Sequence, residues 1–90
     1  MAKKGYKKKY SNSEKYNYYE GISTAMGDAS FCKTRKDADD LLKTRYKLKK
    51  MCKDRKDKDG VSFQNGYIGW VKFKKMQNSI RETGKYNGKW

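Results

Sequence analysis

The chain has 90 residues, of which 24 are lysine or arginine and 10 are aspartate or glutamate, so its formal net charge at pH 7 is +14. Histidine is absent, which removes the side chain most used for acid–base catalysis near neutral pH, and no Walker, nucleophile-elbow or dinucleotide-binding glycine motif occurs. This composition argues against an enzyme and predicts one small domain at most.

The hydrophobic core is expected to be thin. Leucine, isoleucine, valine and phenylalanine together make up 11 of the 90 residues, below the roughly 20% at which a highly charged chain is expected to be disordered. Eight tyrosines and two tryptophans partly compensate, because these rings can be buried while a polar atom stays in water.

Targeting and metal-binding signals are missing. No apolar run approaches the roughly 20 residues of a transmembrane helix, and Met1-Ala2 is followed by lysine and tyrosine instead of an apolar signal-peptide core. We therefore expect a protein of the cytoplasm or of a virion or other nucleoprotein particle, not one secreted by a signal peptide. Cys32 and Cys52 form no C-x-x-C unit, so we expect free, packed thiols with a disulfide as the alternative, and no metal or cofactor.

Residues 1–10, MAKKGYKKKY, are expected to form a basic, tyrosine-bearing arm. Lysines can contact phosphates and tyrosine rings can stack on bases, although a solubilising tail is the alternative. The candidate nucleic-acid contacts in this arm are Lys3, Lys4, Tyr6, Lys7, Lys8, Lys9 and Tyr10.

A single domain is expected over residues 11–84, beginning with a helix over about residues 12–26. Ser11 and Glu14 fit a capping box, and Gly27 is placed to end the helix. One stripe at helical spacing contains Tyr16, Tyr19, Ile22 or Ser23, and Met26. We expect this stripe to face the core, with a base-stacking platform as the alternative, and Phe31 to fill the join to the next helix.

The central helix is predicted over about residues 35–55. Thr34 and Asp37 resemble a capping box, and the acidic residues precede the basic ones, which suits the helix dipole. At 100° per residue, one arc holds the apolar residues Ala38, Leu41, Leu42, Tyr46, Leu48 and Cys52. The opposite side, within about 60°, holds Lys36, Lys43, Lys47 and Lys50. These lysines are either a solvated face or phosphate contacts.

Arg45 and Lys49 project into the middle of the apolar arc of this helix. Either their aliphatic stems lie along the core, or the helix meets two separate partners on either side of them.

From Val61 the sequence favours strands. Val61 and Phe63 alternate with polar residues, Asn65-Gly66 is typical of a type I′ turn, and the residues after it are β-branched or aromatic. We therefore predict a hairpin over about residues 61–72, preceded by a tight turn at Asp59-Gly60.

A helical pattern competes with the hairpin at its second strand. Trp70, Phe73, Met76 or Gln77, and Ile80 also fit one helical face ending at Gly84, so a short helix over about residues 73–83 can follow the hairpin. The predicted fold class is α+β, two helices plus a hairpin, with an all-α three-helix fold as the alternative. Further candidate nucleic-acid contacts beside these aromatic residues are Lys72, Lys74 and Lys75.

Residues 85–90 are expected to form a second basic aromatic arm, in which Tyr86 is a candidate for stacking on a base and Trp90 is expected to dock on protein.

The charge is the main functional signal. Twenty of the 24 basic residues are lysine, a point-charge donor suited to non-specific phosphate contact. We expect a non-catalytic, basic accessory protein of a nucleoprotein assembly that binds DNA or RNA non-specifically. The alternative is a structural protein that decorates or cements a virion or capsid-like shell and is ordered by its neighbours.

Overall fold

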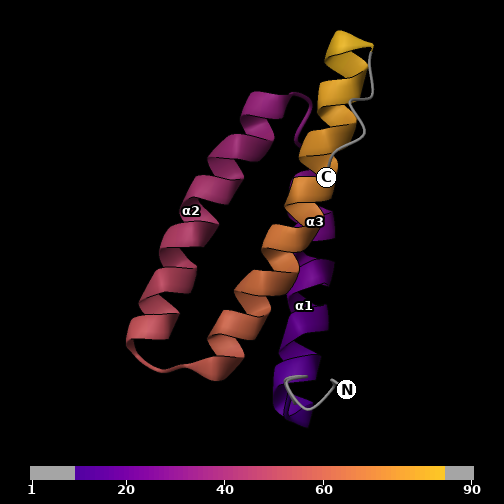
Figure 1. The fold of residues 1–90 in the computed structure, drawn as a ribbon. Coiled ribbons are helices and arrows are strands. Elements are labelled where there is room, and N and C mark those ends of the chain that lie inside the picture. The colour runs from indigo at the N-terminus through magenta and orange to yellow at the C-terminus, as the bar shows by residue number, and fades with distance from the viewer. Residues whose placement is uncertain (1–9, 85–90) are drawn as a thin grey trace, which may run out of the picture.

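The computed structural model describes residues 10–84, which form three helices (Figure 1): α1 (Asn12–Ala29), α2 (Arg35–Asp54) and α3 (Lys58–Thr83). Helices α1 and α2 both pack along α3, and contacts between α1 and α2 are sparse. No strand occurs in the described part of the chain, so the α+β prediction is wrong and the three-helix alternative is confirmed. None of these helices is both long and apolar enough to cross a membrane.

The starts of α1 and α2 are as predicted. Ser11 and Glu14 form a complete capping box, and so do Thr34 and Asp37. The backbone N–H groups of Lys33 and Thr34 donate to the Asp37 carboxylate at 3.0 and 3.2 Å, which lowers the pKa of this carboxyl group.

Helix α1 does not end at Gly27 as predicted. It continues to Ala29, which is buried, and the Ser30 N–H closes the helix on the Gly27 carbonyl oxygen at 3.3 Å. The packing of Ala29 extends the helix by most of a turn, because helix boundaries in proteins follow tertiary contacts as well as local stop signals.

The region predicted as a hairpin, residues 61–72, lies inside α3. This helix runs between α1 and α2 and is buried on more than one face, so it lacks the single apolar stripe by which an amphipathic helix is recognised. Asp59-Gly60 also belongs to its first turn, where the Asp57 carboxylate accepts from the Gly60 N–H at 2.9 Å. The predicted end at Gly84 is confirmed: Gly84 has a left-handed φ of 71°, and its N–H donates to the Ile80 carbonyl oxygen at 2.6 Å.

Small residues bring the backbones of α1 and α3 close together. The buried face of α1 consists of Gly21, Ala25 and Ala29. A Cβ at Gly21 would overlap the carbonyl oxygen of Phe63, and one at Gly66 would overlap that of Tyr18. Gly66 is therefore a packing residue and not the turn residue that Asn65-Gly66 suggested.

The tyrosine stripe of α1 faces solvent, which contradicts the prediction that it faces the core. Tyr16 is 65% exposed, Tyr19 66% and Met26 51%. The small residues occupy the contact with α3, so the larger side chains of α1 point outward.

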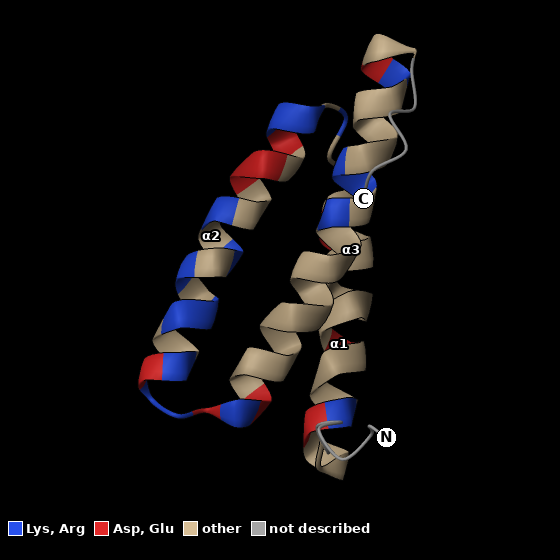
Figure 2. Ribbon diagram, viewed as in Figure 1, with Lys and Arg blue, Asp and Glu red and all other residues tan. Residues whose placement is uncertain are grey.

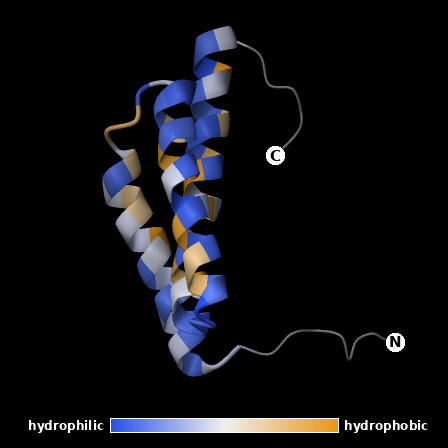
Figure 3. Cartoon of the chain, turned by 90° about the vertical axis from the view of Figure 1, so that its left-hand side faces the viewer, coloured by the Kyte–Doolittle hydropathy of each residue, from blue (hydrophilic) through white to orange (hydrophobic). Residues whose placement is uncertain are grey.

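The core lies along both sides of α3, and Figure 3 shows the hydrophobic positions gathering where the helices face one another. Its buried members are Ala25, Ala38, Leu42, Tyr67, Ile68 and Val71. The predicted apolar arc of α2 is largely confirmed, because Ala38, Leu42 and Cys52 are buried and only Tyr46 is well exposed.

The join between α1 and α2 is filled by Cys32 and Asn78, and not by Phe31, which is 82% exposed. The Asn78 amide donates to the carbonyl oxygens of Cys32 at 3.4 Å and Thr34 at 3.0 Å, which anchors the connection on α3. Cys32 and Cys52 are buried free thiols, as expected. They lie at opposite ends of α2, which is about 30 Å long, so the disulfide alternative is wrong.

Gly66→Ala is expected to destabilise the fold by about 1–3 kcal/mol, because the added methyl group overlaps the backbone of α1. Gly69→Ala is the matched control on the same helix: no atom lies within 4 Å of its Cβ position, so alanine there is expected to stabilise the helix by up to about 1 kcal/mol. Urea unfolding followed by circular dichroism measures both, and equal effects would contradict the close approach of α1 and α3.

Candidate nucleic-acid interface

Four of the predicted contacts form one surface, which we call the lysine face: Lys36, Lys43, Lys47 and Lys50. All four are exposed on the side of α2 opposite the buried residues Ala38 and Leu42. The packing of α2 on α3 therefore turns this face to solvent, and Figure 2 shows basic residues along most of α2.

Three lysines of this face have no ion-pair partner among residues 10–84. Lys36 Nζ lies 3.5 Å from Asp40 Oδ2, but both side chains are largely exposed, so this ion pair contributes about 1 kcal/mol at most. Within residues 10–84, no carboxylate lies within 4 Å of the amino groups of Lys43, Lys47 or Lys50. Because these lysines are four and three residues apart, their charges follow one another along the helix.

The α3 lysines do not form one group. Lys72 is exposed, and its Nζ lies 5.9 Å from the centroid of the Tyr46 ring on α2, so it adds a positive charge beside α2 at the edge of the lysine face. Lys75 instead forms an ion pair with Asp39, in which Nζ lies 2.6 Å from Oδ1. This ion pair lowers the pKa of the Asp39 carboxyl group and links α3 to α2. Lys74 lies about 200° around the helix from Lys72 and lines an open hollow of about 450 Å³.

Arg45 is held inside the protein by groups from both other helices. Its guanidinium carbon lies 3.8 Å from the centroid of the Tyr67 ring, and Nη2 lies 3.8 Å from Asp28 Oδ2 on α1. Gln64 accepts a long hydrogen bond from Nη1 at 3.4 Å. Helix α2 packs mainly on α3, so the expected arrangement in which α2 meets two separate partners is not observed. Arg45 instead lies along the core, over the buried ring of Tyr67, and we do not count it among the phosphate contacts.

Tyr67 completes this cluster. Its hydroxyl donates to Asp28 Oδ2 at 2.6 Å. Burial of the hydroxyl, and to a smaller extent this hydrogen bond, raises the pKa of Tyr67 to about 12. No local sequence pattern identifies these partners, although an arginine within an apolar arc implies that an acceptor lies nearby.

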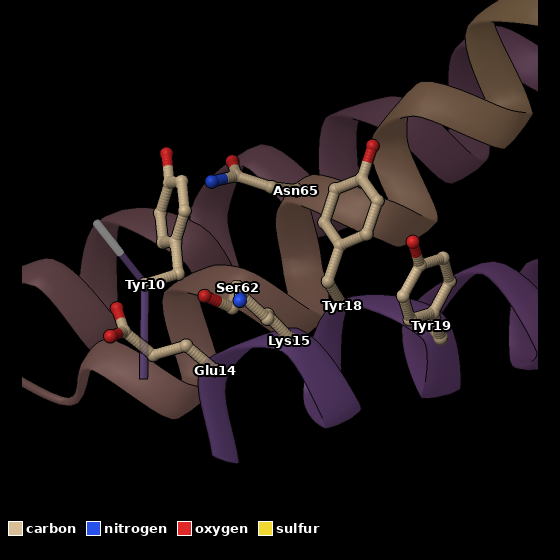
Figure 4. Close-up of a pocket in the computed structure, with 7 residues that line it drawn as sticks. All are labelled: Tyr10, Glu14, Lys15, Tyr18, Tyr19, Ser62 and Asn65. Atoms are coloured by element: carbon tan, nitrogen blue, oxygen red, sulfur yellow. The ribbon is translucent and has the colours of Figure 1, made fainter. Parts of the chain in front are cut away.

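Tyr10 lies in a separate groove between the N-terminal half of α1 and the start of α3 (Figure 4). The groove has a volume of about 300 Å³ and is lined by Tyr10, Glu14, Lys15, Tyr18, Tyr19, Ser62 and Asn65. The lysine face points away from α3, so the groove and the lysine face are two distinct surfaces. Sequence reasoning missed Lys15, Tyr18 and Asn65, because they converge only when α1 packs on α3.

The remaining candidates, Lys3, Lys4, Tyr6, Lys7, Lys8, Lys9 and Tyr86, lie outside the described residues, as does Trp90. Residues 10–84 bring together no group of three or more cysteine, aspartate or glutamate side chains able to hold a metal ion. Comparison with protein families, curated protein sequences and solved structures found no match.

The free energy of unfolding is expected to fall as the pH rises from about 10 to about 12. The Tyr67 hydroxyl keeps its proton up to about pH 12 when folded but releases it near pH 10 when unfolded. Deprotonation of this hydroxyl therefore favours the unfolded state and lowers the free energy of unfolding by about 2–3 kcal/mol at most.

Urea unfolding at a series of alkaline pH values measures this effect. Tyr67→Phe is expected to lower stability by about 1 kcal/mol near neutral pH and to reduce the alkaline decline. Tyr16→Phe, at an exposed tyrosine, is expected to leave the decline unchanged. A native-like decline in the Tyr67→Phe variant would contradict the assignment.

Proposed function

We propose that this chain is a non-catalytic, basic accessory protein of a nucleoprotein assembly that binds DNA or RNA through the lysine face and Lys72. The observation that supports the proposal is the exposure of Lys43, Lys47 and Lys50 on one side of α2 with no carboxylate within ion-pair distance among residues 10–84. Such a row of like charges favours a polyanionic partner.

The binding would be non-specific. Lysine offers a compact charge that suits phosphate oxygens, whereas discrimination between bases uses mainly arginine, asparagine and glutamine on a fixed element. Helix α2 contains no asparagine or glutamine, and its Arg45 is engaged by Tyr67 and Asp28. Release of counterions from the phosphates would supply most of the affinity, and the five lysines in residues 1–9 would add to it.

The variant with Lys43→Gln, Lys47→Gln and Lys50→Gln tests the lysine face. With duplex DNA, the slope of log binding constant against log salt is expected to become shallower by up to about 0.9 per lost phosphate contact. The measurement is a titration with labelled DNA at several salt concentrations.

A second triple variant supplies a control of equal charge. Lys33, Lys56 and Lys58 are exposed but lie in or next to the helix connections, so glutamine at these positions removes the same three charges away from the lysine face. This control variant is expected to lose less affinity for DNA than the variant of the lysine face, and its salt dependence is expected to change less. Equal losses in the two variants would show that net charge alone determines binding and would contradict the proposal.

The outward face of α1 supports a second candidate function, a structural protein that decorates or cements a virion or capsid-like shell. Tyr16, Tyr19 and Met26 are more than half exposed on this helix, and Phe31 is 82% exposed just after it. Aromatic residues and methionine are enriched in protein–protein interfaces. Helix α1 also carries three acidic residues against one lysine, which suits a protein surface better than phosphates.

Serine at Tyr16, Met26 and Phe31 distinguishes the two functions. If the chain acts through nucleic acid, this variant is expected to bind DNA like the native chain and to co-sediment normally with particles of the assembly. If the chain acts as a shell protein, co-sedimentation is expected to be lost while DNA binding is kept. In that case, the variant with Lys43→Gln, Lys47→Gln and Lys50→Gln is expected to lose DNA binding and to keep co-sedimentation.

A further inference from the structure

The groove between α1 and α3 follows from the close approach of these helices. Gly66 faces the carbonyl oxygen of Tyr18, so the two backbones nearly touch at this point. Larger neighbouring side chains cannot enter the contact and stand at its edge: Tyr18 rises from α1 and Asn65 from α3. The walls that carry Tyr18 and Asn65 are therefore held by two packed helices, whereas Tyr10 precedes the first residue of α1.

The groove presents aromatic rings around hydrogen-bonding groups. Figure 4 shows the rings of Tyr10 and Tyr18 standing apart, with the Asn65 amide at the level of the rings and Ser62 and Lys15 lower, between them. Tyr10 is 46% exposed and Tyr18 41%, so both rings are accessible. The Asn65 amide makes no hydrogen bond to another described residue, which leaves its donor and acceptor for a ligand.

We propose that this groove binds one unpaired base of a single-stranded nucleic acid, stacked on Tyr10 or Tyr18 with the Asn65 amide at the base edge. The inference rests on the proposed function and makes it more specific. Stacking on aromatic rings holds single strands with little regard to sequence. An amide can pair with the exposed edge of a base. The volume of about 300 Å³ is at the lower end of ligand sites and suits a small flat group.

The charges of the groove favour a base over a phosphate as its occupant. Lys15 and Glu14 both line it, so their charges nearly cancel. The Glu14 carboxylate is already engaged, because Oε1 accepts from the Ser11 N–H at 2.9 Å. The phosphates would lie outside the groove. Five lysines precede Tyr10 in the sequence and are candidates for contacting them. A duplex is excluded from the groove, because its bases are paired and stacked.

The test uses the full chain and an oligonucleotide of about twelve nucleotides, with 2-aminopurine at its centre, as a single strand and as a duplex. The native chain is expected to bind the single strand more tightly than the duplex at the same salt concentration and to change the 2-aminopurine fluorescence. Tyr10→Ala and Tyr18→Ala are each expected to weaken single-strand binding roughly tenfold and to leave duplex binding unchanged.

Two controls separate stacking from folding. Tyr16→Ala removes an exposed tyrosine of the same helix outside the groove and is expected to change neither affinity. Tyr18→Phe keeps the ring and is expected to keep single-strand binding. If Tyr18→Ala lowers the helix content, Tyr10→Ala and Tyr18→Phe still provide the comparison.

The outcomes distinguish this inference from the proposed function. The groove assignment would be overturned if Tyr10→Ala and Tyr18→Ala bound the single strand as tightly as Tyr16→Ala. Salt-dependent binding through the lysine face would then still stand. The absence of binding to either nucleic acid at low salt would overturn both.

Discussion

The fold depends on the close contact between α1 and α3 at Gly21 and Gly66. Each glycine faces a backbone carbonyl of the other helix, so neither position has space for a side chain. Packing of this kind brings two helix backbones together without ordering long side chains, which limits its cost in conformational entropy. It suits a chain with few aliphatic residues. The same contact turns the tyrosines of α1 outward and forms the groove beside Tyr18.

Helix α2 has two sides of different character. One side packs on α3 through Ala38 and Leu42 and is reinforced by the Asp39–Lys75 ion pair and the Arg45 cluster. The other side carries the lysine face. These charges can lie close together because they stay in water, where a pair of charges interacts weakly and salt screens it further. The proposed binding surface therefore places no unpaired charge in the core.

Features that depend on residues close together in the sequence were predicted well. Features that depend on contacts between helices were not. Both capping boxes, the extent of α2, its lysine face and the stop at Gly84 depend on side chains a few residues apart, so they could be derived from spacing. The hairpin prediction failed because Asn65-Gly66 has the composition of a turn, whereas Gly66 is required by a contact with a helix more than 40 residues away. The prediction that the tyrosine stripe of α1 faces the core was wrong for the same reason. Helical periodicity identifies a face, but it does not show that Gly21, Ala25 and Ala29 form the contact with α3. The groove and the partners of Arg45 combine residues from separate helices and have no local signature.

The lysines on the exposed side of α2 also affect the folding equilibrium. Like charges at positions i and i+4 of a helix destabilise it by a few tenths of a kcal/mol per pair, and here Lys43, Lys47 and Lys50 lie on the same side. A polyanion that binds only the folded chain would remove this repulsion and increase the folded population by mass action. The concentration of its anionic partner would then set both how much of the chain is bound and how much of it is folded.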